Sequence, residues 1–288
     1  MEYKNIIYEK DGSIIRITLN RPEKMNAISV QLNHELVDAI GEVDKDDDVK
    51  VVILKGAGPC FSSGYDLSEV GHLYGWKEPK PGEKVRPPSQ RTRLRADRFT
   101  FYEAHSRLLL CQKLTIAQVH GYCTGGALTT VLHCDFIIAS EDCKLGHVEE
   151  RMGFAGVTIS PIFILRTGLT RALELCITGK AIDGLEASRI GLVNRAVPVD
   201  KLEAEVNELA QGLARYPKDG IAFGKIQRHL IYDMMGVTKG FAPAYVVHSF
   251  LTNMRWEPGE YNFLKERREK GVREAAHGKH DFYKDLDK

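Results

Sequence analysis

Hydrophobic and polar residues alternate along the first twenty positions in the way that paired strands require. Two β-branched runs in IIYEKDGSIIRITL, residues 6–19, flank Asp11–Gly12, which is a strong signal for a tight turn. Ser29 then precedes a segment whose apolar residues recur every three or four positions, and this predicts a capped helix to about Val43. The chain therefore opens with a predicted hairpin and an amphipathic helix.

Short apolar runs of strand length follow, separated by helical patterns. Strands are predicted at residues 49–56, 115–122, 135–140 and 193–198, and helices at about 94–113, from near Gly126, and over most of the chain after Pro161. The last stretch, 263–283, is predicted as one charged helix with a tail. This alternation predicts an α/β fold, divided into a core at 1–198 and a helical C-terminal region at 199–288.

The amino-acid composition limits which classes of binding partner are expected. The 288 residues are 43% hydrophobic and 27% charged, as in ordinary globular proteins, and 40 Lys plus Arg balance 39 Asp plus Glu. That balance gives no case for nucleic acid or an anionic membrane as partner, and no apolar run reaches the length of a membrane span. The charged start predicts no signal peptide, and six cysteines without metal-binding spacing are interpreted as reduced core thiols. We therefore expect a cytoplasmic protein without a metal.

Two glycine-containing junctions are the first candidates for chemistry. Ser63-Gly64-Tyr65-Asp66 follows the strand at 49–56, and Thr124-Gly125-Gly126-Ala127 follows the strand at 115–122. Backbone N–H groups at strand-to-helix junctions are unpaired and favour negative charge, so two such loops side by side can form an oxyanion hole. The alternative interpretation is that both are simple tight turns.

Five segments, taken in order, resemble the crotonase superfamily of enoyl-CoA hydratases and isomerases: NRPEKMNAIS, CFSSGYDLSE, HGYCTGGAL with CDFIIAS, LGHVEERMGF, and GKAIDGLEASRIGLVNRAVP. The resemblance covers nearly the whole chain. It implies a spiral of ββα turns with a C-terminal helical trimerisation region, a homotrimer or homohexamer, and an acyl-CoA thioester as substrate. Coenzyme A would enter as part of that substrate, with no separate cofactor.

The resemblance also assigns candidate residues. It places the two enolate-binding N–H groups on Tyr65 and Gly126. It places the substrate beside the following residues: Lys24, Met25, Ala27, Ser63, Asp66, Leu67 and Ser68.

The acid–base residues depart from the usual hydratase pattern. Hydratases of the family usually carry two glutamates, but the first position, three residues after Gly126, is Thr129 here, and Glu149 occupies the second. Glu150 is interpreted as a surface residue and His147 as a weak modulator of Glu149. His133 could reach the site from two helical turns past Gly126, but a core position is the commoner role.

One carboxylate leaves three reactions open. Glu149 could activate water for addition to a C=C bond with Thr129 holding that water, could carry a proton from C2 to C4 as in an isomerase, or could activate water for C–C hydrolysis of a cyclic keto-acyl-CoA. We expect a hydratase first. A catalytically silent CoA- or RNA-binding scaffold is the non-enzymatic alternative, and the balanced charge argues against RNA.

Residues 74–98 form a longer segment than the family usually has here, which favours a cyclic or branched acyl group over a straight chain. Its arginines, among them Arg93, Arg95 and Arg98, could meet CoA phosphates, but a solvated charged face is the preferred interpretation.

Overall fold

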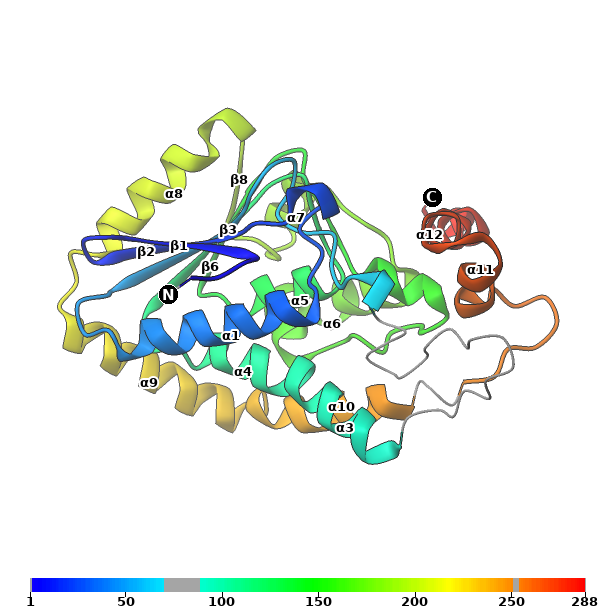
Figure 1. The fold of residues 1–288 in the computed structure, drawn as a ribbon. Coiled ribbons are helices and arrows are strands. Elements are labelled where there is room, and N and C mark those ends of the chain that lie inside the picture. Colours follow the sequence, from blue (N-terminus) through cyan, green and yellow to red (C-terminus); the bar gives the residue numbers. More distant parts are fainter. Residues whose placement is uncertain (1, 70–88, 251–253, 288) are drawn as a thin grey trace.

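A six-stranded sheet forms the centre of the protein in a computed structural model that describes residues 2–69, 89–250 and 254–287 (Figure 1). The strands lie in the order β1 (Ile6–Asp11), β2 (Ile14–Leu19), β3 (Val51–Gly56), β4 (Leu114–Val119), β6 (Phe136–Ser140) and β8 (Arg195–Val197). The β1–β2 hairpin is antiparallel and pairs Asp11 with Ile14, whereas all later neighbours are parallel. The predicted hairpin is confirmed, and so are the strands predicted at 49–56, 135–140 and 193–198.

Both faces of this sheet are covered, which explains why its inner strands read as continuous apolar runs. Val52 and Leu54 of β3 join the cluster formed with α1 (Val30–Lys45), α4 (Ala104–Leu109) and α5 (Gly126–Leu132). Val51 and Ile53 point the other way, toward α8 (Val199–Leu213) and α9 (Lys218–Met234). Since α8 packs on the sheet just after residue 198, the proposed division at 198/199 is not a gap in packing, and it stays a prediction.

A second, two-stranded sheet generates the spiral. The short strands β5 (Tyr122–Thr124) and β7 (Lys144–Gly146) pair in parallel, and each closely follows a strand of the main sheet. The strand predicted at 115–122 is therefore two strands, because Gly121 turns the chain with φ 61° between them. Each strand pair then leads into a helix, α5 after β5 and the 3₁₀ helix η3 (Val148–Met152) after β7. This is the ββα order that the resemblance implied.

The helix predicted at about 94–113 differs from the observed one. Helical structure begins earlier, with α3 (Gln90–Asp97), continues through a π-helical turn, η2 (Arg98–Glu103), and ends with α4 at Leu109. Ser89 fixes the earlier start because its hydroxyl accepts the Thr92 N–H. Most of the proline-rich excursion, residues 70–88, lies outside the described residues.

The C-terminal third is helical as predicted, with one difference. After α6 (Pro161–Thr178), α7 (Gly184–Arg189), α8, α9 and α10 (Phe241–Phe250), the final segment forms two helices, α11 (Phe263–Lys270) and α12 (Val272–Phe282), rather than one. Gly271, with φ 91° and ψ 168°, breaks the helix between them. This pair stands apart from the sheet in Figure 1. Within the described ranges, no helix is both long and apolar enough to cross a bilayer.

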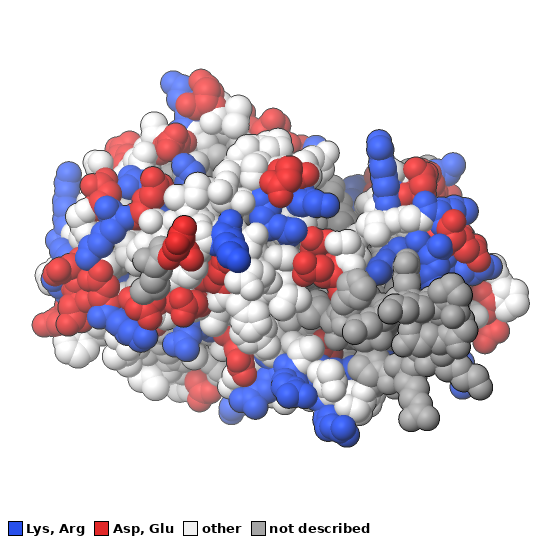
Figure 2. Space-filling model, viewed as in Figure 1, with Lys and Arg blue, Asp and Glu red and all other residues white. Residues whose placement is uncertain are grey.

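Acidic and basic side chains are interspersed on the face seen in Figure 2. This agrees with the near-equal counts of acidic and basic residues in the whole sequence.

Candidate active site

The two glycine-containing loops lie against each other. The Ser62 N–H donates to the Tyr122 carbonyl at 2.8 Å, and the Thr124 N–H donates back to the Ser62 carbonyl at 3.2 Å. A Cβ on Gly64 would stand 2.7 Å from the Thr124 carbonyl oxygen and 3.5 Å from the Gly126 nitrogen. Glycine at position 64 therefore lets the first loop approach the start of α5.

Two N–H groups at this junction are free. The first loop forms two hydrogen bonds with Ile28: the Gly64 carbonyl accepts the Ile28 N–H at 2.8 Å, and the Asp66 N–H donates to the Ile28 carbonyl at 3.0 Å. The N–H of Tyr65, between them, takes no part in this pairing. Gly125 donates to the Gly146 carbonyl at 2.9 Å, which leaves the Gly126 N–H. Neither the Tyr65 nor the Gly126 N–H donates to an acceptor among the described residues. Free N–H groups on adjacent loops can bind an anionic oxygen.

The adjacent glycines 125 and 126 keep this space open. Gly125 has φ 57° and ψ −129°, a conformation that residues with a Cβ avoid, and a Cβ there would stand 2.9 Å from Oε2 of Glu149. A Cβ on Gly126 would overlap the ring of Tyr65. A side chain at position 125 would therefore press on the Glu149 carboxylate, and one at position 126 would displace the Tyr65 ring.

Glu149 presents one unpartnered oxygen to this region. It lies in η3, and its Oε1 is 3.2 Å from Nδ1 of His147, a buried side chain that packs edge-on against Phe163. Its Oε2 is buried and has no hydrogen-bond partner among the described residues. A buried carboxylate oxygen without a donor is costly, so it marks a group that is available to a ligand. His147 thus contacts Glu149, and its role as a modulator stays a prediction.

The interpretation of Glu150 as a surface residue is wrong. Its side chain is 3% exposed, and its carboxylate accepts the N–H groups of Gly156, Val157 and Thr158 together with the Thr158 hydroxyl. Burial raises the pKa of Glu150 and the nearby charge of Glu149 adds to the rise, while the Thr158 and Gly156 donors oppose it. Glu150 therefore holds the loop 156–158.

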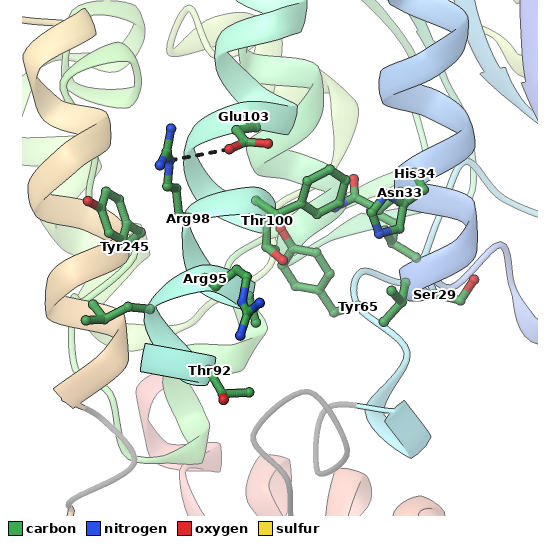
Figure 3. Close-up of a pocket in the computed structure, with 15 residues that line it drawn as sticks. Ser29, Asn33, His34, Tyr65, Thr92, Arg95, Arg98, Thr100, Glu103 and Tyr245 are labelled. Carbon is green, nitrogen blue, oxygen red and sulfur yellow. Dashed lines mark ion pairs between the residues drawn. The ribbon is translucent and has the colours of Figure 1, made fainter. Parts of the chain in front are cut away.

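Tyr65 also borders a cavity of about 730 Å³ between α1 and the α3–η2 segment (Figure 3). Burial raises the pKa of its phenol, as do the charges of Glu149 and Asp97. The polar residues of the lining include Asn33, His34, Arg95, Thr100 and Tyr245. A π-helical turn at a cavity wall is typical of functional regions, and η2 supplies several of these side chains.

The arginines of this segment are not one solvated face. Arg95 lines the cavity, Arg98 pairs with Glu103 at 3.3 Å, and Arg93 is buried at 5% exposure. The interpretation of these arginines as a solvated charged face is therefore wrong for Arg93, whose side chain is buried.

The residues predicted near the CoA form one folded loop. Met25 is left-handed with φ 53°, and its carbonyl accepts the Ser63 N–H at 3.0 Å, whereas Lys24 is exposed. The Ala27 carbonyl accepts a guanidinium N–H of Arg21, which also pairs with Asp66 at 3.1 Å.

Asp66 is occupied within the protein. Burial favours a higher pKa for its carboxyl, but hydrogen bonds from Ser68 and the Arg21 guanidinium outweigh it and lower the pKa. The neighbouring Leu67 packs against the C-terminal helices.

The sequence interpretation missed two residues that hold these loops. One is Arg21. The other is Asn26, which is fully buried, accepts the Arg21 N–H and donates to the carbonyls of Ala57 and Cys60. Both stand in the motif NRPEKMNAIS, so their place in that motif was the available signal.

The side chains of Thr129 and His133 form hydrogen bonds with backbone carbonyls of their own helix and its N-terminal cap. The Thr129 hydroxyl donates to the Gly125 carbonyl at 3.5 Å, and no hydrogen bond joins it to Glu149 in the described part of the chain. Nδ1 of His133 lies 2.7 Å from the Thr129 carbonyl, and its ring stacks on His105. Burial lowers the pKa of His133 to about 4, as expected for a neutral core histidine.

All six cysteines are free and buried. Within the described residues, no group of three or more His, Cys, Asp or Glu side chains is placed to hold a metal ion.

Comparison with known proteins identifies the family. The model of the enoyl-CoA hydratase/isomerase family matches residues 9–270. This chain belongs to the enoyl-CoA hydratase/isomerase family. The crotonase resemblance is confirmed, and the protein is a crotonase-type enzyme.

Individual relatives agree with this assignment. A probable enoyl-CoA hydratase of Mycobacterium bovis is 31% identical over 255 residues, covering 84% of this chain and 91% of the relative. A hydroxycinnamoyl-CoA hydratase-lyase of Pseudomonas fluorescens is 31% identical over 212 residues, 73% of each chain. The crystal structure of an enoyl-CoA hydratase/isomerase from Xanthobacter autotrophicus Py2 superposes with a TM-score of 0.85 at 29% identity, covering 97% of this chain and 98% of that one.

Proposed function

We propose that this family member is a hydratase that adds water to the C=C bond of an enoyl-CoA thioester. The observation that carries the proposal is the buried, unpartnered Oε2 of Glu149, which faces Gly125 beside the free N–H groups of Tyr65 and Gly126. A base and two oxyanion donors around one space are what this reaction requires.

One carboxylate suffices for the proton balance. The thioester oxygen accepts the N–H groups of Tyr65 and Gly126, and Glu149 removes a proton from water as the water oxygen bonds to C3. The C2=C3 electron pair moves toward the thioester and forms an enolate, which the two N–H groups stabilise. Glu149 then returns its proton to C2, so the net change is addition of one water and the carboxylate is regenerated. Removing one oxyanion donor in other enzymes costs about 3–4 kcal/mol, which is the scale expected of each N–H here.

The cavity bordered by Tyr65 supports a bulky acyl group. Its volume of about 730 Å³ lies within the range of sites for small ligands, and its lining mixes aromatic rings with hydroxyl and amide groups. We propose that it receives the far end of a cyclic or branched acyl chain. The similarity to a hydroxycinnamoyl-CoA enzyme supports an acyl group that carries a ring.

Isomerisation is the second candidate. Glu149 has the only carboxylate oxygen that is both buried and unpartnered among the described residues, and a single carboxylate can carry a proton from C2 to C4. The same donors would hold the same enolate. C–C hydrolysis of a cyclic keto-acyl-CoA remains the third alternative.

Heavy-oxygen water distinguishes these reactions. The protein is incubated in H₂¹⁸O with crotonyl-CoA, a 3-enoyl-CoA, cinnamoyl-type CoA thioesters and a cyclic keto-acyl-CoA, and the masses of the products are measured by mass spectrometry. The hydratase proposal expects a labelled 3-hydroxyacyl-CoA, with a faster rate for a ring-bearing substrate than for crotonyl-CoA. Conversion of the 3-enoyl-CoA without label would establish an isomerase. Formation of a labelled acyl-CoA with a new carboxylate from the cyclic keto-acyl-CoA would establish a hydrolase. Absence of turnover on every thioester would contradict all three.

Assembly is also a proposal. Exposed apolar side chains follow α6 and α9: Leu165, Leu169, Leu173, Ile177, Phe223, Ile226, Leu230 and Met234. Burial of such faces between subunits is the usual explanation of exposed apolar stripes, so we propose a homotrimer or a homohexamer. The buried free cysteines support a reducing compartment such as the cytoplasm.

A further inference from the structure

The C-terminal helices contact both loops of the candidate site. Tyr261, Phe263 and Ala275 form a small apolar cluster, and two residues from the core pack against it. One is Leu67, which lies two residues after Tyr65, and the other is Met152, three residues after Glu149. The pair α11–α12 therefore joins the loop of the first free N–H to the turn of the carboxylate.

Polar contacts fix the same turn more tightly. Nζ of Lys279, on α12, donates to the carbonyl of Val148 at 3.0 Å, directly before Glu149. Arg151, in the same turn, donates to Asp287 at 3.1 Å and to the Thr178 carbonyl at 3.0 Å. The 3₁₀ turn that carries Glu149 is thus held from the C-terminal segment on both sides of that residue.

Lys279 is unusual because it is 4% exposed and no carboxylate forms an ion pair with it among the described residues. Burial lowers the pKa of Lys279 to about 8, while the negative charge of Glu149 opposes this fall and Arg151 adds to it. Within the described residues, the hydrogen-bond acceptor of this buried ammonium is the Val148 carbonyl.

We propose that Lys279 is a positioning residue that orients the Glu149 turn through the Val148 carbonyl. This inference rests on the proposed role of Glu149. It assigns a function to the C-terminal helix pair besides packing, since α12 supplies the side chain that holds this turn.

Other ionisable groups face the same two side chains. Around Glu149 these are His147 and Glu150 in its own segment and Tyr65 from the opposite loop. Around Lys279 they are Arg151 on η3 and its own neighbour His280 on α12, with Asp287 beyond Arg151. Asp287 already pairs with Arg151, so its charge is balanced there.

The decisive experiment follows the backbone amide nitrogen of Glu149 by ¹⁵N NMR from neutral to alkaline pH. This nitrogen shares a peptide group with the Val148 carbonyl, so its chemical shift reports on the hydrogen bond from Lys279. In the wild type the chemical shift should change with a midpoint near pH 8, as the Lys279 ammonium becomes a neutral and weaker donor. Lys279→Arg stays charged and should show no such change, and Lys279→Met, which has no donor, should show none either. The exposed Lys284 provides the matched control, and Lys284→Met should change nothing.

The pH profile of kcat/KM gives the second readout on any thioester that the wild type converts. An alkaline decline near pH 8, caused by loss of the Lys279 proton, should be present in the wild type and absent from Lys279→Arg. A wild-type Glu149 amide shift that does not change near pH 8, or the same alkaline limb in Lys279→Arg, would overturn the proposal.

The NMR experiment needs no turnover. A protein that converts no enoyl-CoA but shows the change near pH 8 in the wild type alone would contradict the proposed function and leave the contact between Lys279 and the Glu149 turn established. If Lys279→Met does not fold, the comparison of wild type with Lys279→Arg decides the question, since both carry the charge and only one can lose it near pH 8.

Discussion

Glu149 and Glu150 stand next to each other in one 3₁₀ turn, yet the two sides of that turn are built differently. On one side, the Glu150 carboxylate accepts four hydrogen bonds from residues 156–158. On the other side, Oε2 of Glu149 is buried without a partner, close to Gly125. Neighbouring side chains in a 3₁₀ helix point about 120° apart, so adjacent residues can serve separate purposes.

The difference shows how stability and reactivity are separated at this site. A fully bonded buried carboxylate orders the loop around it, and removing its partners or its charge costs folding free energy. A carboxylate with a free oxygen contributes little to folding but can exchange a proton with a ligand. Mutations on the two sides of the turn should therefore affect different measurements.

The largest effect is expected at Glu149. Gln has the same shape but cannot accept a proton as a base, so Glu149→Gln should lower kcat on the order of 10³-fold. The free energy of unfolding should change little, because Oε2 makes no hydrogen bond within the described residues. Steady-state kinetics and chemical denaturation measure both quantities. A variant that keeps near-wild-type turnover while folded would remove Glu149 from the mechanism.

Glu150→Gln should show the opposite result. The Gln amide would place N–H groups against N–H donors of the 156–158 loop, so we expect a loss of about 2–3 kcal/mol in the free energy of unfolding. Turnover per folded molecule should fall much less than in Glu149→Gln. If kcat fell by the same factor at both positions, the separation of roles across the turn would be wrong.

Gly125→Ala tests the space that faces Glu149. The backbone at φ 57° and ψ −129° is strained for Ala, and the new methyl group would press on Oε2 of Glu149. We expect a cost of about 1–2 kcal/mol in stability together with reduced kcat. Gly212→Ala is the control, because a Cβ there meets nothing within 4 Å in a helix interior. Equal behaviour of the two variants would argue against close packing at Gly125.

The smallest effect is expected at Thr129. Its hydroxyl donates to the Gly125 carbonyl, so Thr129→Val should reduce kcat by less than about threefold if Glu149 handles the water alone. A much larger loss in hydration, with unchanged stability, would show that Thr129 holds the water in place of the second glutamate. Rates on one enoyl-CoA and thermal unfolding are sufficient to decide.

Much of this site follows from local sequence patterns. The hairpin, the capped helix from Ser29 and the glycine junctions at 64 and 125–126 were predicted because turn and capping preferences act over a few residues. Which glutamate faces the site was also predicted, but only through the resemblance. The prediction that Glu150 lies at the surface is wrong because the loop 156–158 folds back over its carboxylate. No periodicity in the sequence indicates that contact.

The sequence by itself determined the strand and helix order, the family, and the residues that stand at the two glycine-containing junctions. Only the tertiary structure decided that Glu150 is buried and bonded, that Tyr65 borders a cavity with η2, and that Lys279 lies against the Glu149 turn from 130 positions away. The reason is physical. Hydrophobic period and turn chemistry are local properties, whereas the burial and charge of a side chain depend on segments that meet only when the chain has folded.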